Sequence, residues 1–145
     1  MGLSSKTHLR VRYAETDQMG IVYHSNYLIW FEVGRSQLFR DLNLPYTEFE
    51  KQGLGLAVVE ANCRYRKPAH YDDELVIVTV IEKMTIRSVS FSYLVYRDET
   101  LLVEGKTVHL FINKEGHLAN VRKYEIWQHL QPVLEKQEAS KSAPS

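Results

Sequence analysis

The segment that most limits the possible folds is 26–42 (NYLIWFEVGRSQLFRDL), which we predict to form a helix. Ser25 or Asn26 can cap its start, because their side chains accept hydrogen bonds from the first free amides. The first two turns are apolar on nearly every side, whereas a surface helix carries only an apolar stripe, so we expect this helix to be mostly buried. Gly34 costs about 1 kcal/mol relative to alanine inside a helix, and we expect another backbone to approach it closely.

Alternation of apolar and polar residues predicts strands before and after this helix. Four strands follow it, and the short loops between them favour antiparallel pairing. The segment 75–84 is apolar on both faces, so we expect it to be central and covered on both sides. One buried helix then needs a sheet that curls around it. The predicted strands are 7–13, after a loose start, 56–67, 75–84, 88–97 and 101–113, with a short helix at 46–52.

The composition excludes several classes of protein. Lysine plus arginine and aspartate plus glutamate number 18 each, so the net charge is zero, which excludes a strongly basic nucleic-acid binder or a polybasic membrane module. The single cysteine, Cys63, permits no intrachain disulfide and no cysteine-based metal site within one chain, and it suits a reducing compartment. No stretch is apolar and long enough for a signal peptide or a membrane span. We therefore expect a cytoplasmic protein.

The length of 145 residues fits one domain, which we place at 1–134. Residues 124–134 are predicted to form a helix or an extended end, and 135–145 (EKQEASKSAPS) to form a flexible tail. A chain of zero net charge has little repulsion between copies, and an open five-stranded sheet leaves two free edges. Both features favour self-association.

The residues around the helix start offer chemistry. A helix start presents free amides and the positive end of the dipole, which can hold negative charge on an oxygen. Asp17 precedes it in a turn-forming segment and can act as a general base or a nucleophile, and His24 can donate to an oxygen. A carboxylate beside an oxyanion site indicates acyl transfer. On spacing alone, Asp17 as a plain turn former and His24 as an ordinary helix-start residue stay open.

Two runs of the sequence resemble a known family. The run 13–27 (YAETDQMGIVYHSNY) is similar to the signature of hotdog-fold acyl-CoA thioesterases of the hydroxybenzoyl-CoA thioesterase and YbgC-like type. The run 64–75 (RYRKPAHYDDEL) is a second match, and the resemblance covers roughly residues 7–125. It implies an α+β hotdog fold, in which a curved antiparallel five-stranded sheet wraps around one long central helix. It also implies homodimers, which often pair into homotetramers.

The resemblance also implies a reaction and roles for single residues. The reaction is hydrolysis of an acyl-CoA thioester to the free acid and coenzyme A, with Asp17 as base or nucleophile. His24 matches the residue at the helix start whose amide polarises the thioester carbonyl, and its side chain is implicated in a subgroup of the family. Tyr23 and Asn26 match further motif positions; we count Tyr23 as catalytic and Asn26 as substrate-binding. No metal and no cofactor are expected.

Coenzyme A carries phosphates, so we expect basic side chains to meet it. A serine can hydrogen-bond a pantetheine amide, and a second carboxylate on a neighbouring strand can join the site. Each of these groups can equally be a solvated side chain of an exposed strand. Besides Asn26, the substrate-binding candidates are Glu60, Arg64, Arg66, Lys67, Lys83, Arg87 and Ser88.

Two alternatives remain beside thioester hydrolysis. One is a hotdog dehydratase acting on acyl-carrier-protein substrates, which needs a histidine–carboxylate pair set across a dimer. The other is a non-catalytic module that binds acyl-CoA, which could dispense with Asp17. The expected partners are an acyl-CoA, or an acyl carrier protein bearing the acyl group, and further copies of the chain; neither nucleic acid nor membrane is expected. The sequence leaves the identity of the acyl group open.

Overall fold

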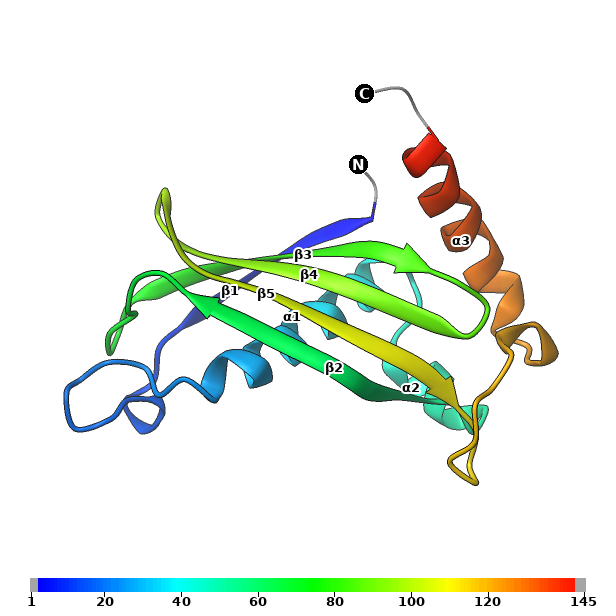
Figure 1. Ribbon diagram of the computed structural model, residues 1–145, viewed down its shortest axis with the longest axis horizontal. Helices are drawn as coiled ribbons and strands as arrows, with labels where there is room; N and C mark the ends of the chain where they lie inside the picture. Colours follow the sequence, from blue (N-terminus) through cyan, green and yellow to red (C-terminus); the bar gives the residue numbers. More distant parts are fainter. Residues whose placement is uncertain (1–2, 143–145) are drawn as a thin grey trace.

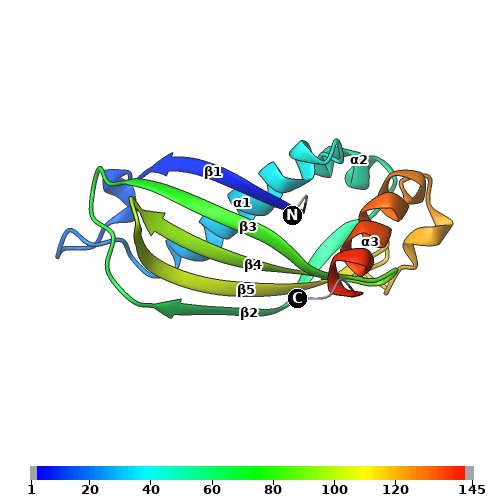
Figure 2. The same ribbon diagram turned by 90° about the horizontal axis from the view of Figure 1, so that it is seen from above.

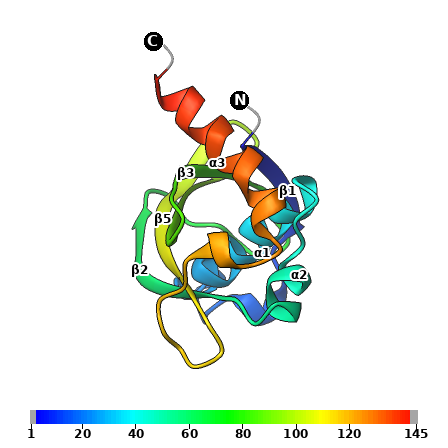
Figure 3. The ribbon, with the colours of Figure 1, turned by 90° about the vertical axis from the view of Figure 1, so that its right-hand side faces the viewer.

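In the computed structural model, which describes residues 3–142, one long helix lies against the inner face of a five-stranded antiparallel sheet (Figure 1). The elements are β1 (Ser4–Arg10), a 3-10 turn (Tyr13–Glu15), α1 (Asn26–Asp41), α2 (Tyr46–Lys51), β2 (Gly55–Tyr65), β3 (Glu74–Met84), β4 (Ser88–Arg97), β5 (Thr100–Ile112), a second 3-10 turn (Val121–Lys123) and α3 (Trp127–Ser142). The strand order is β1-β3-β4-β5-β2, so β1 and β2 are the edges. Figure 3 shows the sheet curving around α1, which confirms the predicted hotdog fold.

The predicted helix and the four strands after it are confirmed to within about two residues at each end. The first strand is displaced, because β1 begins at Ser4 and ends at Arg10 instead of spanning 7–13. The chain leaves the strand ladder at Val11, and Tyr13 opens a 3-10 turn with its side chain 77% exposed. The β2 strand carries a bulge between Val58 and Glu60 where it pairs with β5.

Two glycines let α1 lie close on the sheet. Phe31 of α1 stacks on Tyr93 of β4, with ring centroids 4.2 Å apart. A Cβ at Gly105 of β5 would lie 2.3 Å from the Phe31 ring, and a Cβ at Gly34 would lie 2.4 Å from Oγ1 of Thr79 on β3. The expectation that another backbone approaches Gly34 is therefore wrong, because side chains of β3 fill that space.

The expectation that α1 is mostly buried is wrong for one side of the helix. Trp30 and Phe31 face the sheet and are buried, whereas Leu28, Ile29 and Val33 are 42%, 55% and 43% exposed. The sheet curves around only part of the helix, so the remaining side meets solvent in the single chain. An apolar helix surface of this kind is typical of a contact with another molecule.

The outer face of the sheet is also more open than predicted. In β3 the inward side chains of Leu75 and Ile77 are buried, whereas Val76 and Val78 on the outer face are only half-buried. The expectation that this strand is covered on both sides is wrong here, because α3 reaches only the Met84 end of β3. Figure 2 shows α3 beside that end of the sheet.

Residues 135–142, which we expected to belong to a flexible tail, continue α3 as far as Ser142. Gln137 is buried and holds the helix on β3: its amide donates to the carbonyl of Glu82 at 2.8 Å and accepts from the amide of Met84 at 3.3 Å. Residues 143–145 lie outside the described residues. In the described part of the chain, no helix combines the length and hydropathy needed to cross a bilayer.

Candidate active site

The start of α1 carries backbone amides that the protein leaves open. The amides of Asn26 and Tyr27 donate to the carbonyls of Tyr23 at 3.0 Å and His24 at 3.3 Å. Among residues 3–142, no acceptor is recorded for the amides of His24 and Ser25. The side chain of Ser25 makes no capping hydrogen bond. Two free amides at the positive end of a 16-residue helix can stabilise negative charge on an oxygen.

Asp17 lies in the tight turn before α1, with its carboxylate exposed. Its Oδ1 accepts hydrogen bonds from the amides of Met19 at 2.8 Å and Ile21 at 3.3 Å. The turn closes through Gly20, whose φ of +78° favours glycine and whose amide donates to the Asp17 carbonyl at 3.0 Å. Within the described chain, Oδ2 of Asp17 has no recorded partner. One carboxylate oxygen thus holds the loop, and the other can meet water or a carbonyl carbon.

The two sequence runs that resemble the thioesterases lie side by side in the structure. The amide of Val22 donates to the carbonyl of Ala69 at 2.9 Å, and Ile21 forms an antiparallel bridge with His70. Because Ala69 is fully buried, the loop of Asp17 rests on a fixed segment of the chain.

Glu15 is a site residue that the sequence reasoning missed. It is only 6% exposed, and its carboxylate accepts hydrogen bonds from the amide of Arg12 and the indole of Trp30, both at 2.8 Å. Its backbone carbonyl accepts from the amide of Tyr23 at 2.8 Å and the side chain of Asn26 at 2.9 Å. Glu15 thus joins the loop of Asp17 to the first turns of α1.

The charge of Glu15 is held in place by its donors. Burial would raise the pKa of this carboxyl, but the hydrogen bonds from Arg12 and Trp30 and the nearby Arg12 guanidinium outweigh burial, so the pKa is lowered. The sequence signal was weak: Glu15 stands in the recognised run, but nothing in its spacing separates a buried carboxylate from an exposed one. Asn26, predicted to bind substrate, donates to the carbonyls of Glu15 and Tyr23 and so braces the loop.

A shallow apolar hollow of about 390 Å³ opens beside the helix start. The hydroxyl of Tyr65 donates to the carbonyl of His24 at 3.3 Å, and the ring of Tyr23 lies 4.4 Å from that of His24. Burial and the neighbouring Cys63 raise the pKa of Tyr65 to about 12, so its hydroxyl keeps its proton. The lining residues are Ile21, Val22, His24, Tyr27, Tyr65, Arg66, Lys67 and Pro68.

The hollow brings together only some of the predicted substrate-binding residues. Arg66 and Lys67 line it, and Arg66 forms an ion pair with Glu104. Glu60 and Arg64 pair with outward-facing positions of β5, so they lie on the outer face of the sheet.

The remaining candidates, Lys83, Arg87 and Ser88, lie around the β3–β4 turn, at the end of the sheet opposite the start of α1 (Figure 1). Ser88 is engaged locally, since its hydroxyl lies 2.8 Å from that of Thr85. One chain does not bring these three residues to the helix start. The described residues contain no group of three or more histidine, cysteine, aspartate or glutamate side chains placed to hold a metal ion.

A curved antiparallel sheet around one long central helix is the architecture of the hotdog fold. The family model of the thioesterase-like superfamily matches residues 11–139. The chain is 44% identical over 113 residues to YneP of Bacillus subtilis (strain 168), covering 77% of this chain and 82% of YneP. It is 31% identical over 101 residues to the acyl-CoA thioester hydrolase YbgC of Escherichia coli O157:H7, covering 69% and 75% of the two chains.

Among solved structures, the DHNA-CoA thioesterase from Staphylococcus aureus superposes with a TM-score of 0.87 at 28% identity, covering 97% of each chain. The chain therefore belongs to the thioesterase-like superfamily. This membership confirms the resemblance carried by the runs 13–27 and 64–75.

Proposed function

We propose that this protein hydrolyses the thioester of an acyl-CoA, giving the free acid and coenzyme A. The observation that carries the proposal is the pair of free amides, of His24 and Ser25, at the start of α1 and in the same loop as Asp17. The name of the relative YbgC, an acyl-CoA thioester hydrolase, supports the same reaction.

In the proposed mechanism, the thioester carbonyl oxygen accepts hydrogen bonds from the free amides at the helix start. One such donor is worth about 3 kcal/mol of transition-state stabilisation. Asp17 takes a proton from water as the water attacks the carbonyl carbon, or its Oδ2 attacks that carbon and water then hydrolyses the mixed anhydride. The C–S bond breaks as the coenzyme A thiolate leaves, so a strong general acid is not required. His24 lies beside the leaving sulfur in this arrangement, and Tyr23 packs on the His24 ring.

The hollow beside His24 is the proposed seat of the pantetheine arm. Its apolar wall matches the arm's carbon chain, and Lys67 offers a cation for a phosphate. Arg66 is a weaker candidate, because Glu104 already neutralises it. A thioester on an acyl carrier protein presents the same arm, so a carrier protein is a second possible source of the acyl group.

We further propose that the working unit is a homodimer, which can pair into a homotetramer. The free edge of β2 exposes Val58 and Val59 by 52% and 54%, and α1 exposes Ile29 by 55%. A second copy that pairs along this edge would bury these side chains. Light scattering behind gel filtration tests this: the wild type should elute as a dimer or larger, and Val59→Lys should lower the mass, since an edge lysine opposes strand pairing.

A thiol-release assay over a panel of acyl-CoAs tests the proposed reaction. Asp17→Asn keeps the Oδ1 acceptor and so keeps the loop, but it removes the base and nucleophile; we expect turnover to be lost while folding and acyl-CoA binding persist. Asp98→Asn is the matched control, because Asp98 is exposed and its φ of +54° suits asparagine. Unchanged turnover in Asp17→Asn would remove Asp17 from the mechanism. Acyl-CoA binding without any thiol release by the wild type would favour the non-catalytic module, and hydration of an enoyl thioester would favour the dehydratase.

A further inference from the structure

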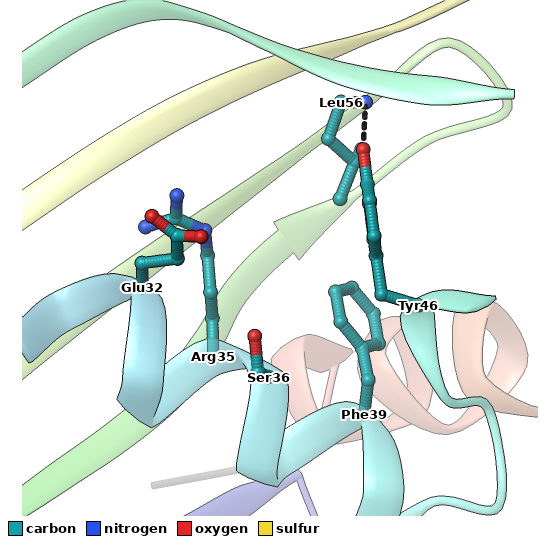
Figure 4. A pocket seen from close by; sticks show the side chains of 6 residues that line it. All are labelled: Glu32, Arg35, Ser36, Phe39, Tyr46 and Leu56. Atoms are coloured by element: carbon teal, nitrogen blue, oxygen red, sulfur yellow. Dashed lines mark hydrogen bonds between the residues drawn. The ribbon is translucent and has the colours of Figure 1, made fainter. Parts of the chain in front are cut away.

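A second cavity, of about 180 Å³, lies beside α1 further along the helix, between α1, α2 and β2. Figure 4 shows that Glu32, Arg35 and Ser36 enter it from α1, while Tyr46 and Leu56 close it from α2 and β2. The wall on the helix side is thus polar except for Phe39, and the opposite wall is largely apolar.

Arg35 is the unusual member of this wall. It is half-buried, and its guanidinium has one recorded partner, the hydroxyl of Tyr93 at 3.4 Å. No ion pair of Arg35 is recorded among residues 3–142, although Glu32 stands one turn earlier on the same helix. A half-buried cation with a single long hydrogen bond has unused donors on the cavity side.

Behind Arg35, a row of buried polar groups crosses the inner face of the sheet. The hydroxyl of Tyr93 lies 2.6 Å from that of Thr107, which lies 2.8 Å from Nε2 of His109. Tyr93 and His109 are fully buried and Thr107 is 3% exposed, and Nδ1 of His109 has no partner. None of these groups is a carboxylate, so the row steadies Arg35 without neutralising it.

The cavity stands in line with the helix start. Leu28, Glu32, Arg35 and Ser36 have the spacing i, i+4, i+7 and i+8, which places them on one face of α1. Ten residues separate Ser25 from Arg35, a rise of about 15 Å along the helix. From its start onward, this face presents free amides, then the exposed apolar side chain of Leu28, then the polar cavity.

We propose that the Arg35 cavity receives the far end of the acyl group, and that this end carries an oxygen that accepts hydrogen bonds, as a carboxylate or a hydroxyl does. The inference rests on the proposed thioester hydrolysis and specifies its substrate class. A carboxylate would neutralise Arg35, whereas a hydroxyl would accept from Arg35 and donate to Glu32. The cavity has the volume of about six water molecules, enough for such an end group with a short stem.

The test compares acyl-CoAs of equal length that differ only at the far end: octanoyl, decanoyl and dodecanoyl chains, each plain, ω-hydroxylated and ω-carboxylated. At the best length, we expect kcat/KM for one polar-ended chain to exceed that of the plain chain by about tenfold or more, as one charged hydrogen bond allows. Plain chains that react as well as both polar series at every length would overturn the inference. This comparison uses the wild-type protein alone and needs no variant.

Variants then assign the preference to the cavity. Arg35→Met keeps the long stem but removes the donors, so the polar-to-plain ratio should fall by about tenfold while plain chains change little. Arg40→Met, an exposed arginine outside the cavity on the same helix, should keep the ratio. Glu32→Gln shows which end group Glu32 contacts. Loss of the Glu32 charge should raise kcat/KM for carboxylated chains relative to hydroxylated ones. An equal effect on both would assign the contact to Arg35 alone.

Failure of this inference and failure of the proposed function give different results. If no chain releases thiol, the proposed hydrolysis itself fails. If plain chains are hydrolysed in a manner that depends on Asp17 but polar ends bring no gain, only the role of the Arg35 cavity fails.

Discussion

The indole Nε1 of Trp30 donates a 2.8 Å hydrogen bond to Oε2 of Glu15 in the interior of the protein. Trp30 lies on the second turn of α1, and Glu15 lies two residues before Asp17, so this bond connects the helix to the loop of the proposed catalytic carboxylate. The backbone carbonyl of Glu15 also accepts hydrogen bonds from the amide of Tyr23 and from the side chain of Asn26. We therefore expect the position of Asp17 relative to the free amides to depend on a contact that touches neither of them.

Trp30→Phe tests whether the hydrogen bond between the indole and Glu15 contributes to both stability and turnover. The variant keeps an aromatic ring but leaves Oε2 of Glu15 without its indole donor, which should cost about 2 kcal/mol of unfolding free energy. Because the loop loses one of its contacts with α1, kcat should fall by about tenfold or more, with a smaller change in KM. Trp127→Phe on α3 is the control and should leave kcat unchanged. A normal kcat in folded Trp30→Phe would show that this bond does not position the loop.

Gly34→Ala should destabilise the protein although alanine favours helix. The helix propensity gain is about 1 kcal/mol, but the new Cβ would lie 2.4 Å from Oγ1 of Thr79, and such overpacking costs about 1–3 kcal/mol. Urea unfolding should give a lower midpoint for Gly34→Ala. Arg40→Ala, on the exposed side of the same helix, should shift the midpoint little in either direction. A midpoint above that of the wild type for Gly34→Ala would mean that α1 lies further from β3 than described.

His109 should make stability depend on pH. Burial, with the charge of Arg35, lowers its pKa from 6.5 to about 4, so the folded protein holds this histidine neutral at pH 7. As the pH falls from 7 to 5, His109 binds a proton in the unfolded chain but stays neutral in the folded chain. The free energy of unfolding should therefore drop by about 2 kcal/mol. His109→Leu should flatten this part of the curve, measured by urea unfolding at several pH values. The exposed His117→Leu should keep the wild-type slope; equal slopes in all three proteins would contradict the assignment.

Gln137 should stabilise the C-terminal helix. Gln137→Ala leaves the amide of Met84 and the carbonyl of Glu82 without these partners, which should cost about 1–3 kcal/mol. Glu138→Ala, exposed on the next position, is the matched control and should be near neutral. Hydrogen exchange should show faster exchange in 127–142 for Gln137→Ala. Identical exchange in the two variants would indicate that α3 does not depend on this contact.

Local sequence patterns were sufficient to predict most of the helices and strands. The apolar alternation in β4 and β5 and the turn residues between them predicted both strands, because strand pairing across a short loop depends on neighbouring residues. Burial could not be predicted in the same way: Ile29 is exposed because of how far the sheet curves around α1, which involves residues distant in sequence. Gln137 illustrates the same limit, since a polar composition predicts a free tail until a buried partner such as the β3 backbone is known.

The site residues show the same difference between what local sequence predicts and what depends on distant residues. Asp17 and His24 were predicted from a short contiguous run, and their catalytic roles remain predictions. Glu15 stands in that run but was passed over, because its function in the structure depends on Trp30, fifteen residues away on another element. Arg87 and Ser88 were selected by residue type alone, and the strand directions carry them to the other end of the sheet.

The contact between Phe31 and Gly105 limits how this scaffold can be redesigned. The ring lies directly on the glycine, so that even a Cβ at position 105 would clash with it, and both hollows described above lie at the flanks of the helix. Substitutions meant to admit bulkier molecules should therefore be made along the sides of α1 and on β2, where they leave the aromatic centre intact.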